Sequence, residues 1–141
     1  RMEAQALAAQ KGLELVLIDG SPGIGCPVIA SLTGCDLALL VTEPTLSAVH
    51  DLERVFRLVS HFGIPAVACL NKSDLNEEMG EEVRIRCREA GVGLEAELPF
   101  RPEVVEALRH ARPPLGNVPA EVEEPLRGLA SAVRERLGYN E

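Results

Sequence analysis

The sequence predicts an α/β protein with a partial, doubly wound parallel sheet of about four strands and helices on both faces. Two observations support this fold class. Three apolar runs lack the alternating polar residues of a half-exposed strand, which favours strands covered on both faces. Segments with helical periodicity separate the runs, and strand followed by helix, repeated, is typical of a parallel sheet. The length of 141 residues suits about one domain.

The expected strands are runs of Leu, Val, Ile and Ala. They are Leu13–Ile18, Leu37–Thr42, Ala66–Leu70 and a weaker run, Leu94–Leu98.

Two amphipathic helices are expected between the later strands. Ser47 can cap the first, whose apolar residues recur every three or four positions until Gly63 ends it. Asn76 can cap the second, which begins with two glutamates that favour a helix N-terminus and stops at Gly91.

Two further helices are expected after the last strand. Pro102 fits the first turn of a short helix. A last amphipathic helix is expected from about Pro125 to Leu137, after a linker-like stretch at Ala111–Pro119.

Charge and composition argue against several classes of partner. The formal net charge of −8 has the wrong sign for direct binding to nucleic acid or to an anionic membrane surface. The apolar runs are too short to span a bilayer, and the four cysteines show no metal-ligand spacing. We therefore expect a cytoplasmic protein with no membrane segment, and, because Arg1 precedes Met2, one whose N-terminal part is missing.

Polar, turn-rich sequence follows each expected strand. These stretches are DGSPGIG at Asp19, TEPTLS at Thr42, NKSD at Asn71 and PFRP at Pro99. Ligands of open parallel sheets bind beyond the carboxyl ends of the strands, so a binding site is expected where these stretches meet.

The glycine-rich loop after Asp19 is not a phosphate-cradling P-loop. Gly20 and Gly25 have the required glycine spacing, but Cys26-Pro27 follow where GxxxxGK[ST] has Lys and Ser or Thr. The chain has two lysines, Lys11 and Lys72, and neither completes such a motif. The glycines also run GxxGxG rather than GxGxxG, which excludes a dinucleotide-binding fingerprint.

Two interpretations of Asp19 remain open. A carboxylate that ends an apolar strand, followed by a permissive Gly/Pro loop, suits an acid that holds Mg²⁺ through water beside a phosphate-sensing switch. The alternative is an ordinary strand-to-helix turn with a capping aspartate.

NKSD also has two interpretations. Asn71 can both donate to and accept from a purine edge, and the Lys72 stem can lie over a ring. The alternative is a strand-to-helix turn that leads to the cap at Asn76.

Three blocks of the sequence resemble a known family. IDGSPGIGCPVIASLTG, LLVTEPTLSAVHDLERV and CLNKSDLN resemble the C-terminal half of a P-loop ATPase of the MinD/ParA/Mrp type, and in particular the branch that carries an inserted ferredoxin domain. The resemblance covers about residues 13–116. It implies a Rossmann-like, three-layer α/β/α fold in which residues 1–141 form the C-terminal portion of one P-loop NTPase domain, with 13–116 as core and 117–141 as terminal helix.

The resemblance also implies residue roles. Asp19 matches the Walker-B acid near Mg²⁺, and Gly20 to Gly25 match the second switch, although Ser21 stands where many relatives have proline. Ser47 and Asp51 match positions that face the partner subunit in an ATP-bound dimer. The nucleotide-binding positions implied are Asp19, Gly20, Ser21, Pro22, Gly23, Asn71, Lys72, Asp74, Pro99 and Phe100.

The family's phosphate-binding lysine and its two [4Fe–4S] clusters belong to segments that this chain does not contain. We therefore expect a full protein that binds ATP and Mg²⁺, dimerises on ATP and resets on hydrolysis. Phosphoryl transfer depends on positioning and charge neutralisation, much of it from that lysine, so this chain alone is expected to be inactive. The sequence does not predict the protein partner or the pathway.

Two alternatives remain. NKxD also reads guanine in GTPases, where the aspartate at the position of Asp74 accepts from the base. Alternatively, the chain is a nucleotide-free interaction module that binds a partner through the helix of Ser47 to Phe62.

Overall fold

The computed structural model describes residues 2–21, 23 and 25–139. Within them lie six helices and three strands. In chain order these are α1 (Met2–Gln10), α2 (Cys26–Leu32), β1 (Ala38–Thr42), α3 (Leu46–His61), β2 (Ala66–Asn71), α4 (Glu77–Ala90), β3 (Gly93–Leu98), α5 (Pro102–Arg109) and α6 (Ala120–Arg136).

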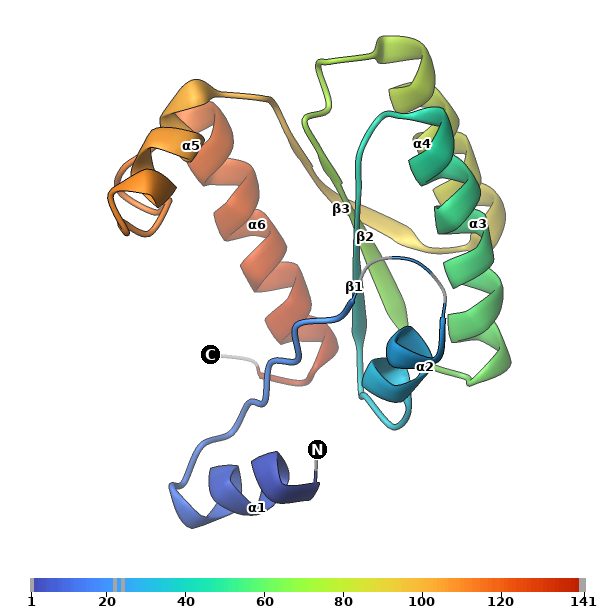
Figure 1. Ribbon diagram of the computed structural model, residues 1–141, viewed down its shortest axis with the longest axis vertical. Helices are drawn as coiled ribbons and strands as arrows, with labels where there is room; N and C mark the ends of the chain where they lie inside the picture. The colour runs from blue at the N-terminus through green and yellow to red at the C-terminus, as the bar shows by residue number, and fades with distance from the viewer. Residues whose placement is uncertain (1, 22, 24, 140–141) are drawn as a thin grey trace.

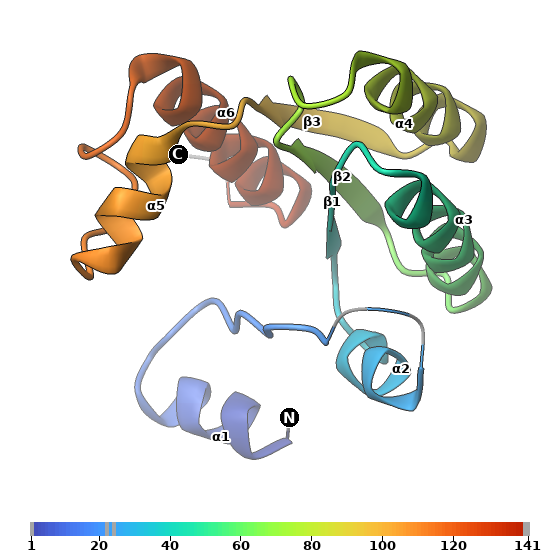
Figure 2. The ribbon, with the colours of Figure 1, turned by 45° about the horizontal axis from the view of Figure 1, so that its top comes forward.

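The three strands form one parallel sheet in the order β1-β2-β3. Helices α3 and α4 cover one face, and α6 packs against the other beside β3 (Figures 1 and 2). The predicted α/β class, the parallel sheet and the helices on both faces are confirmed. A register shift opposite Ala68 and Cys69 places a bulge in β3.

The core lies mainly between the sheet and the pair α3 and α4. Leu70 of β2 and Val83 of α4 are completely buried there. Cys69 faces the other side, where it packs with Ala96 and Leu129, and burial raises the pKa of its thiol to about 11. Cys69 is a free, buried cysteine.

The first expected strand, Leu13–Ile18, is not a strand, so the described residues contain three strands rather than four. The segment has no regular secondary structure and pairs with none of the three strands, and the side chain of Leu17 is 89% exposed. A strand needs a neighbour to satisfy its backbone groups, and no described segment lies in register with this one. In Figure 2, α1 and the chain leading from it to α2 lie apart from the three layers.

Strand β1 is covered on one face only, which corrects the expectation of cover on both. Leu39 and Val41 are 41% and 63% exposed. The Ala38 amide donates to the Pro65 carbonyl on the β2 side at 2.9 Å. Since peptide groups alternate along a strand, those of Leu39 and Val41 face the opposite, open edge.

Two helix boundaries differ from those expected. Thr45, not Ser47, caps α3: its hydroxyl accepts from the Ala48 amide at 3.2 Å. Helix α6 begins at Ala120 and contains Pro125 in its interior. The side chain of Val122 is only 2% exposed, and its packing favours a helix that begins before Pro125. Packing therefore overrides the tendency of proline to lie in the first turn of a helix.

Other expected boundaries are confirmed. Asn76 caps α4 through its side-chain oxygen, and Gly91 ends that helix with φ of 66°. Pro102 lies in the first turn of α5. Helices α1 and α2 were not among the expected elements.

Candidate functional site

The loops after β2 and β3 meet at the carboxyl end of the sheet. The Ser73 amide donates to the Leu98 carbonyl at 2.9 Å, which joins NKSD to the end of β3. Lys72 has φ of 54°, a left-handed conformation that is uncommon for a residue with a side chain. The Asn71 Oδ1 accepts from the Lys72 backbone amide at 3.1 Å, and the side-chain NH2 group of Asn71 remains as its donor. The predicted meeting of these two loops is therefore present.

An ion pair connects the same loop to β1. Lys72 Nζ lies 2.6 Å from Glu43 Oε1, directly after the last residue of β1. Beside it, the hydroxyl of Thr42 is buried without a hydrogen-bond partner among the described residues. Buried polar groups are rarely left unpaired, so Thr42 marks a place where the described chain leaves an interaction unmade.

Both oxygens of the Asp74 carboxylate accept hydrogen bonds from the loop after β3. Its Oδ1 accepts from the Phe100 amide at 2.7 Å, and its Oδ2 accepts from Arg101 Nη1 at 2.7 Å. The Phe100 hydrogen bond, followed by the Arg101 guanidinium, lowers the pKa of the Asp74 carboxyl below its usual value. The carboxylate therefore anchors the loop that contains Pro99 and Phe100.

Arg101 and Glu121 were not predicted as site residues. Arg101 also binds the carboxylate of Glu121, in the first turn of α6, through Nε and Nη2. The basic residue after Pro99-Phe100 was visible in PFRP, but its two acidic partners lie 27 and 20 positions away. The pairing of β2 with β3 brings Asp74 to Arg101, and the packing of α6 against the sheet brings Glu121 to it.

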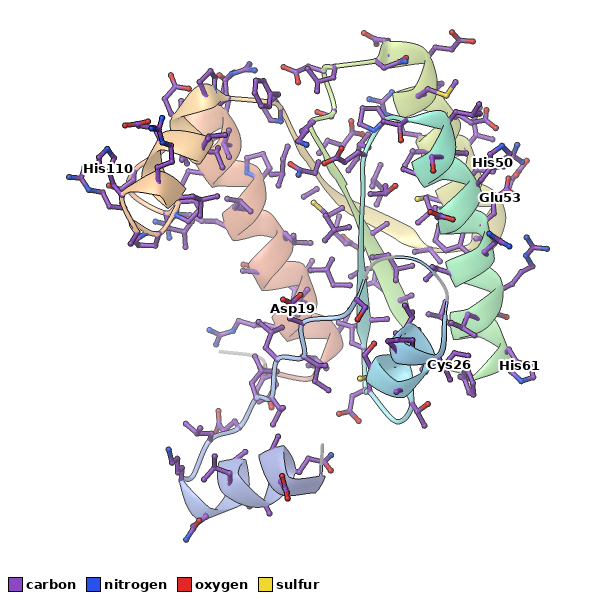
Figure 3. All side chains as sticks on the ribbon, viewed as in Figure 1. Asp19, Cys26, His50, Glu53, His61 and His110 are labelled. Atoms are coloured by element: carbon purple, nitrogen blue, oxygen red, sulfur yellow. The ribbon has the colours of Figure 1, made fainter. Side chains whose placement is uncertain are left out.

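The structure does not bring Asp19 to this edge of the sheet. In Figure 3 Asp19 lies at about mid-height of the molecule, below the upper end where β1 and β2 finish. Its side chain is exposed, as are Gly20, Ser21 and Gly23. Pro22 lies outside the described residues. The separation follows from the unpaired segment before Asp19, because without a neighbouring strand nothing fixes its height along the sheet.

The loop after Asp19 nevertheless has the permissive backbone that the sequence indicated. Gly23 has φ of 89°, a region that residues with side chains avoid. A Cβ on Gly20 would lie 3.5 Å from the Ser31 hydroxyl of α2, which is ordinary contact. Among the described residues of this loop, Gly23 is therefore the one whose backbone conformation requires glycine.

The two predicted dimer residues lie on α3. Ser47 is exposed in the first turn, and Asp51 lies one turn further along, where it forms a 3.9 Å ion pair with Arg54. Residues four apart share a helix face, so both are available on one surface.

Comparisons with solved structures identify the fold. MinD of Aquifex aeolicus superposes with a TM-score of 0.76 at 17% identity and is matched by 93% of this chain. The cell division ATPase MinD of Pyrococcus furiosus gives 0.74 at 22% identity over 96% of the chain. The chain has a MinD-like P-loop NTPase fold. The Pyrococcus horikoshii septum site-determining protein MinD, solved with Mg-ADP, gives 0.74 at 23% identity over 98%.

The chain spans only part of these MinD structures, covering 57% to 58% of their length. Two curated relatives come from Methanocaldococcus jannaschii. The uncharacterized protein MJ0578 is 41% identical over 63 residues, 23% of its length. MJ0579, also uncharacterized, is 31% identical over 75 residues, 28% of its length. No protein-family profile matches the chain.

Two classes of feature are absent from the described part of the chain. None of its helices is long and apolar enough to cross a membrane. It also contains no group of three or more His, Cys, Asp or Glu side chains that could hold a metal ion.

Proposed function

We propose that this chain is the Walker-B, switch and base-recognition half of an ATP-dependent switch of the MinD/ParA type. The observation that carries the proposal is the joining of the NKSD loop to the Pro99–Arg101 loop at the carboxyl end of a MinD-like sheet. Asn71 and Lys72 would contact the nucleotide base, and Pro99-Phe100 would line it. Asp19 would hold Mg²⁺ through water, with Gly20, Ser21, Pro22 and Gly23 as the switch.

Asp19 suits Mg²⁺ on chemical grounds. It is an exposed carboxylate with no hydrogen-bond or ion-pair partner among the described residues, and Mg²⁺ in nucleotide sites keeps several waters and needs few protein ligands. Bound Mg²⁺ would neutralise phosphate charge. The P. horikoshii MinD was solved in complex with Mg-ADP, which supports this choice of cofactor.

The cysteines do not fit an iron–sulfur cluster. Cys69 and Cys87 are buried on opposite faces of the sheet, and Cys26 is exposed on α2. A [4Fe–4S] cluster needs four convergent thiolates. Any such cluster in the full protein would therefore be bound by another segment.

The two edges of the sheet indicate where a further segment joins this half. The outer edge of β3 has a bulge and charged side chains: Glu97 pairs with Arg84 at 2.6 Å, and Glu95 pairs with Arg136. Such features keep an edge strand from pairing with other chains.

Strand β1 has no such protection. Its sequence is ALLVT, and its outward peptide groups belong to Leu39 and Val41. The apolar segment Leu13–Ile18 is also unpaired. We propose that a strand of the P-loop-bearing part of the fold pairs with β1, with Leu13–Ile18 beyond it, and that this pairing raises Asp19 to the nucleotide. The MinD neighbours are long enough to contain such a part, since the chain spans 57% to 58% of them.

The full switch is proposed to be a cytoplasmic protein that forms a homodimer on binding ATP. Ser47 and Asp51 would lie at the dimer contact, because both are available on one face of α3. A solved MinC:MinD complex of A. aeolicus also shows the fold with a protein partner.

The first test is the intact mass of the native polypeptide that carries this segment, captured with an antibody and measured by mass spectrometry. We expect a mass well above 15.2 kDa and a GK[ST] motif in the added sequence. That polypeptide should hydrolyse ATP, and Asp19→Ala should abolish hydrolysis. The isolated chain should show none.

Two results would contradict the proposal. Hydrolysis at a normal rate by the isolated chain would show that no phosphate-binding lysine is needed. Full function of the Asp19→Ala polypeptide would favour the interaction module, and Asp51→Lys would then be the variant that loses partner binding.

A further inference from the structure

Arg101 connects three segments that are distant in sequence. Its Nη1 donates to Asp74 Oδ2 at 2.7 Å and to the Phe100 carbonyl at 2.6 Å. Its Nε and Nη2 bind Glu121, with Nη2 to Oε2 at 3.0 Å. We call Asp74, Arg101 and Glu121 the Arg101 clamp. It ties the loop after β2, the loop after β3 and the first turn of α6 together.

The clamp fixes Phe100 from both sides. The Phe100 amide donates to Asp74 and the Phe100 carbonyl accepts from Arg101, so neither backbone group of this residue is free to rearrange independently. Hydrogen bonds from Arg101 and to Asp74 therefore hold the backbone of the loop that would line a base, and the Phe100 side chain is 38% exposed.

The clamp also occupies the carboxylate that a guanine-reading NKxD motif would use. Guanine presents two donors, the ring N1–H and the exocyclic amine, to an aspartate acceptor. In this chain each oxygen of Asp74 already accepts a hydrogen bond from its own fold. Guanine would have to share both oxygens with these donors, and the two hydrogen bonds orient the carboxylate toward Phe100 and Arg101.

The side chain of Asn71 offers donors that suit either purine. Its oxygen accepts from the Lys72 amide, and its side-chain NH2 group remains as the donor. Both purines present N7 as an acceptor, so the choice between them falls to the position of Asp74.

We propose that Arg101 is a specificity-determining residue that selects adenine over guanine by keeping Asp74 and the Phe100 loop bound to the protein. The inference rests on the proposed nucleotide site and goes beyond it, because it assigns the choice of base to a residue that acts through Asp74. Arg101 is thus a positioning residue and not a catalytic one.

The test uses the native polypeptide that carries this segment, with fluorescent ATP and GTP analogues as probes. The measured quantity is the ratio of the GTP Kd to the ATP Kd. Arg101→Gln frees one oxygen of Asp74 and loosens the loop, so the ratio is expected to fall about tenfold, the effect of one charged hydrogen bond. Arg101→Lys keeps the positive charge but loses the bidentate contact with Glu121, so it is expected to give an intermediate ratio. If the Arg101→Gln polypeptide does not fold, Arg101→Lys replaces it in the test.

Two controls separate specificity from general damage. Arg127→Gln breaks an ion pair with Glu123 within α6, the helix that contains Glu121, and should leave the ratio unchanged. Adding Asp74→Asn to Arg101→Gln removes the carboxylate that guanine would gain, so the ratio should rise again. A purely structural role of Arg101 would not produce this reversal.

The possible results are distinguishable. An unchanged ratio in Arg101→Gln, with ATP still bound, overturns the role of Arg101 and leaves the nucleotide site standing. Equal binding of ATP and GTP by the unaltered polypeptide also overturns it. Binding of neither analogue overturns the proposed function and this inference with it.

Discussion

At the scale of single residues, the structure pairs most of the charged side chains that line the ends and edge of β3. Arg84 binds Glu97 through two hydrogen bonds of 2.9 and 2.6 Å. The hydrogen bond from Arg84 is the largest cause that lowers the pKa of the Glu97 carboxyl, and it outweighs the opposing effect of burial. A carboxyl whose pKa is lower in the folded chain stabilises the fold above its unfolded pKa.

Glu97→Gln is therefore expected to lower the free energy of unfolding at pH 7 by about 1 kcal/mol, a value reduced because both partners are partly exposed. The difference from the unaltered chain should shrink as the pH falls below the ordinary glutamate value of 4.5, since the unfolded chain then takes up a proton that the folded carboxyl, with its lowered pKa, does not yet bind. Urea denaturation at a series of pH values measures this. Glu89→Gln, at a more exposed pair, is the control, and a Glu97 effect independent of pH would contradict the prediction.

At the scale of elements, local signals placed most boundaries within a few residues, and the exceptions have local causes. Ser47 and Thr45 are both good capping residues, and the sequence pattern favoured the wrong one. Thr45 has the extended backbone, with φ of −129°, that a cap requires, whereas Ser47 lies inside the first turn of α3.

Thr45→Ala is expected to destabilise the chain by about 1 kcal/mol, because the Ala48 amide loses its acceptor. Ser47→Ala should change stability by less than about 0.5 kcal/mol. Thermal or urea unfolding of both variants compares them directly. A larger loss for Ser47→Ala would show that the cap is misplaced.

The open edge of β1 gives a second prediction at this scale. In the isolated chain, the amides of Leu39 and Val41 face away from β2, while that of Leu40 faces it. Amide hydrogen exchange followed by NMR should therefore be fast at Leu39 and Val41 and slow at Leu40. Equal protection of all three amides would mean that another segment already pairs with β1.

At the scale of the whole molecule, stability is concentrated in the three layers and not in the N-terminal part. Leu70 is completely buried between the sheet and α4, whereas Leu17 is 89% exposed. These two leucines have the same chemistry and similar apolar neighbours in sequence, so only their tertiary environment distinguishes them.

Leu70→Ala is expected to lower the unfolding free energy by about 3 kcal/mol, the usual effect of a cavity in a packed core. Leu17→Ala should lower it by less than about 0.5 kcal/mol in the isolated chain. In the native polypeptide proposed above, Leu17→Ala should become much more destabilising, because pairing would bury the segment. Urea denaturation of both variants in both forms measures these differences. Equal small effects of Leu17→Ala in the two forms would contradict the proposed strand pairing.

The sequence by itself determined the fold class, three of the four expected strands and the two loops that meet at the sheet edge. It did so because apolar runs, caps at Asn76 and Gly91, and turn residues act over a few positions. Tertiary structure alone decided that Leu13–Ile18 remains unpaired, because a strand exists only beside another strand. It alone also assembled Asp74, Arg101 and Glu121, since hydrogen bonds across 20 and 27 positions leave no periodic trace in the sequence.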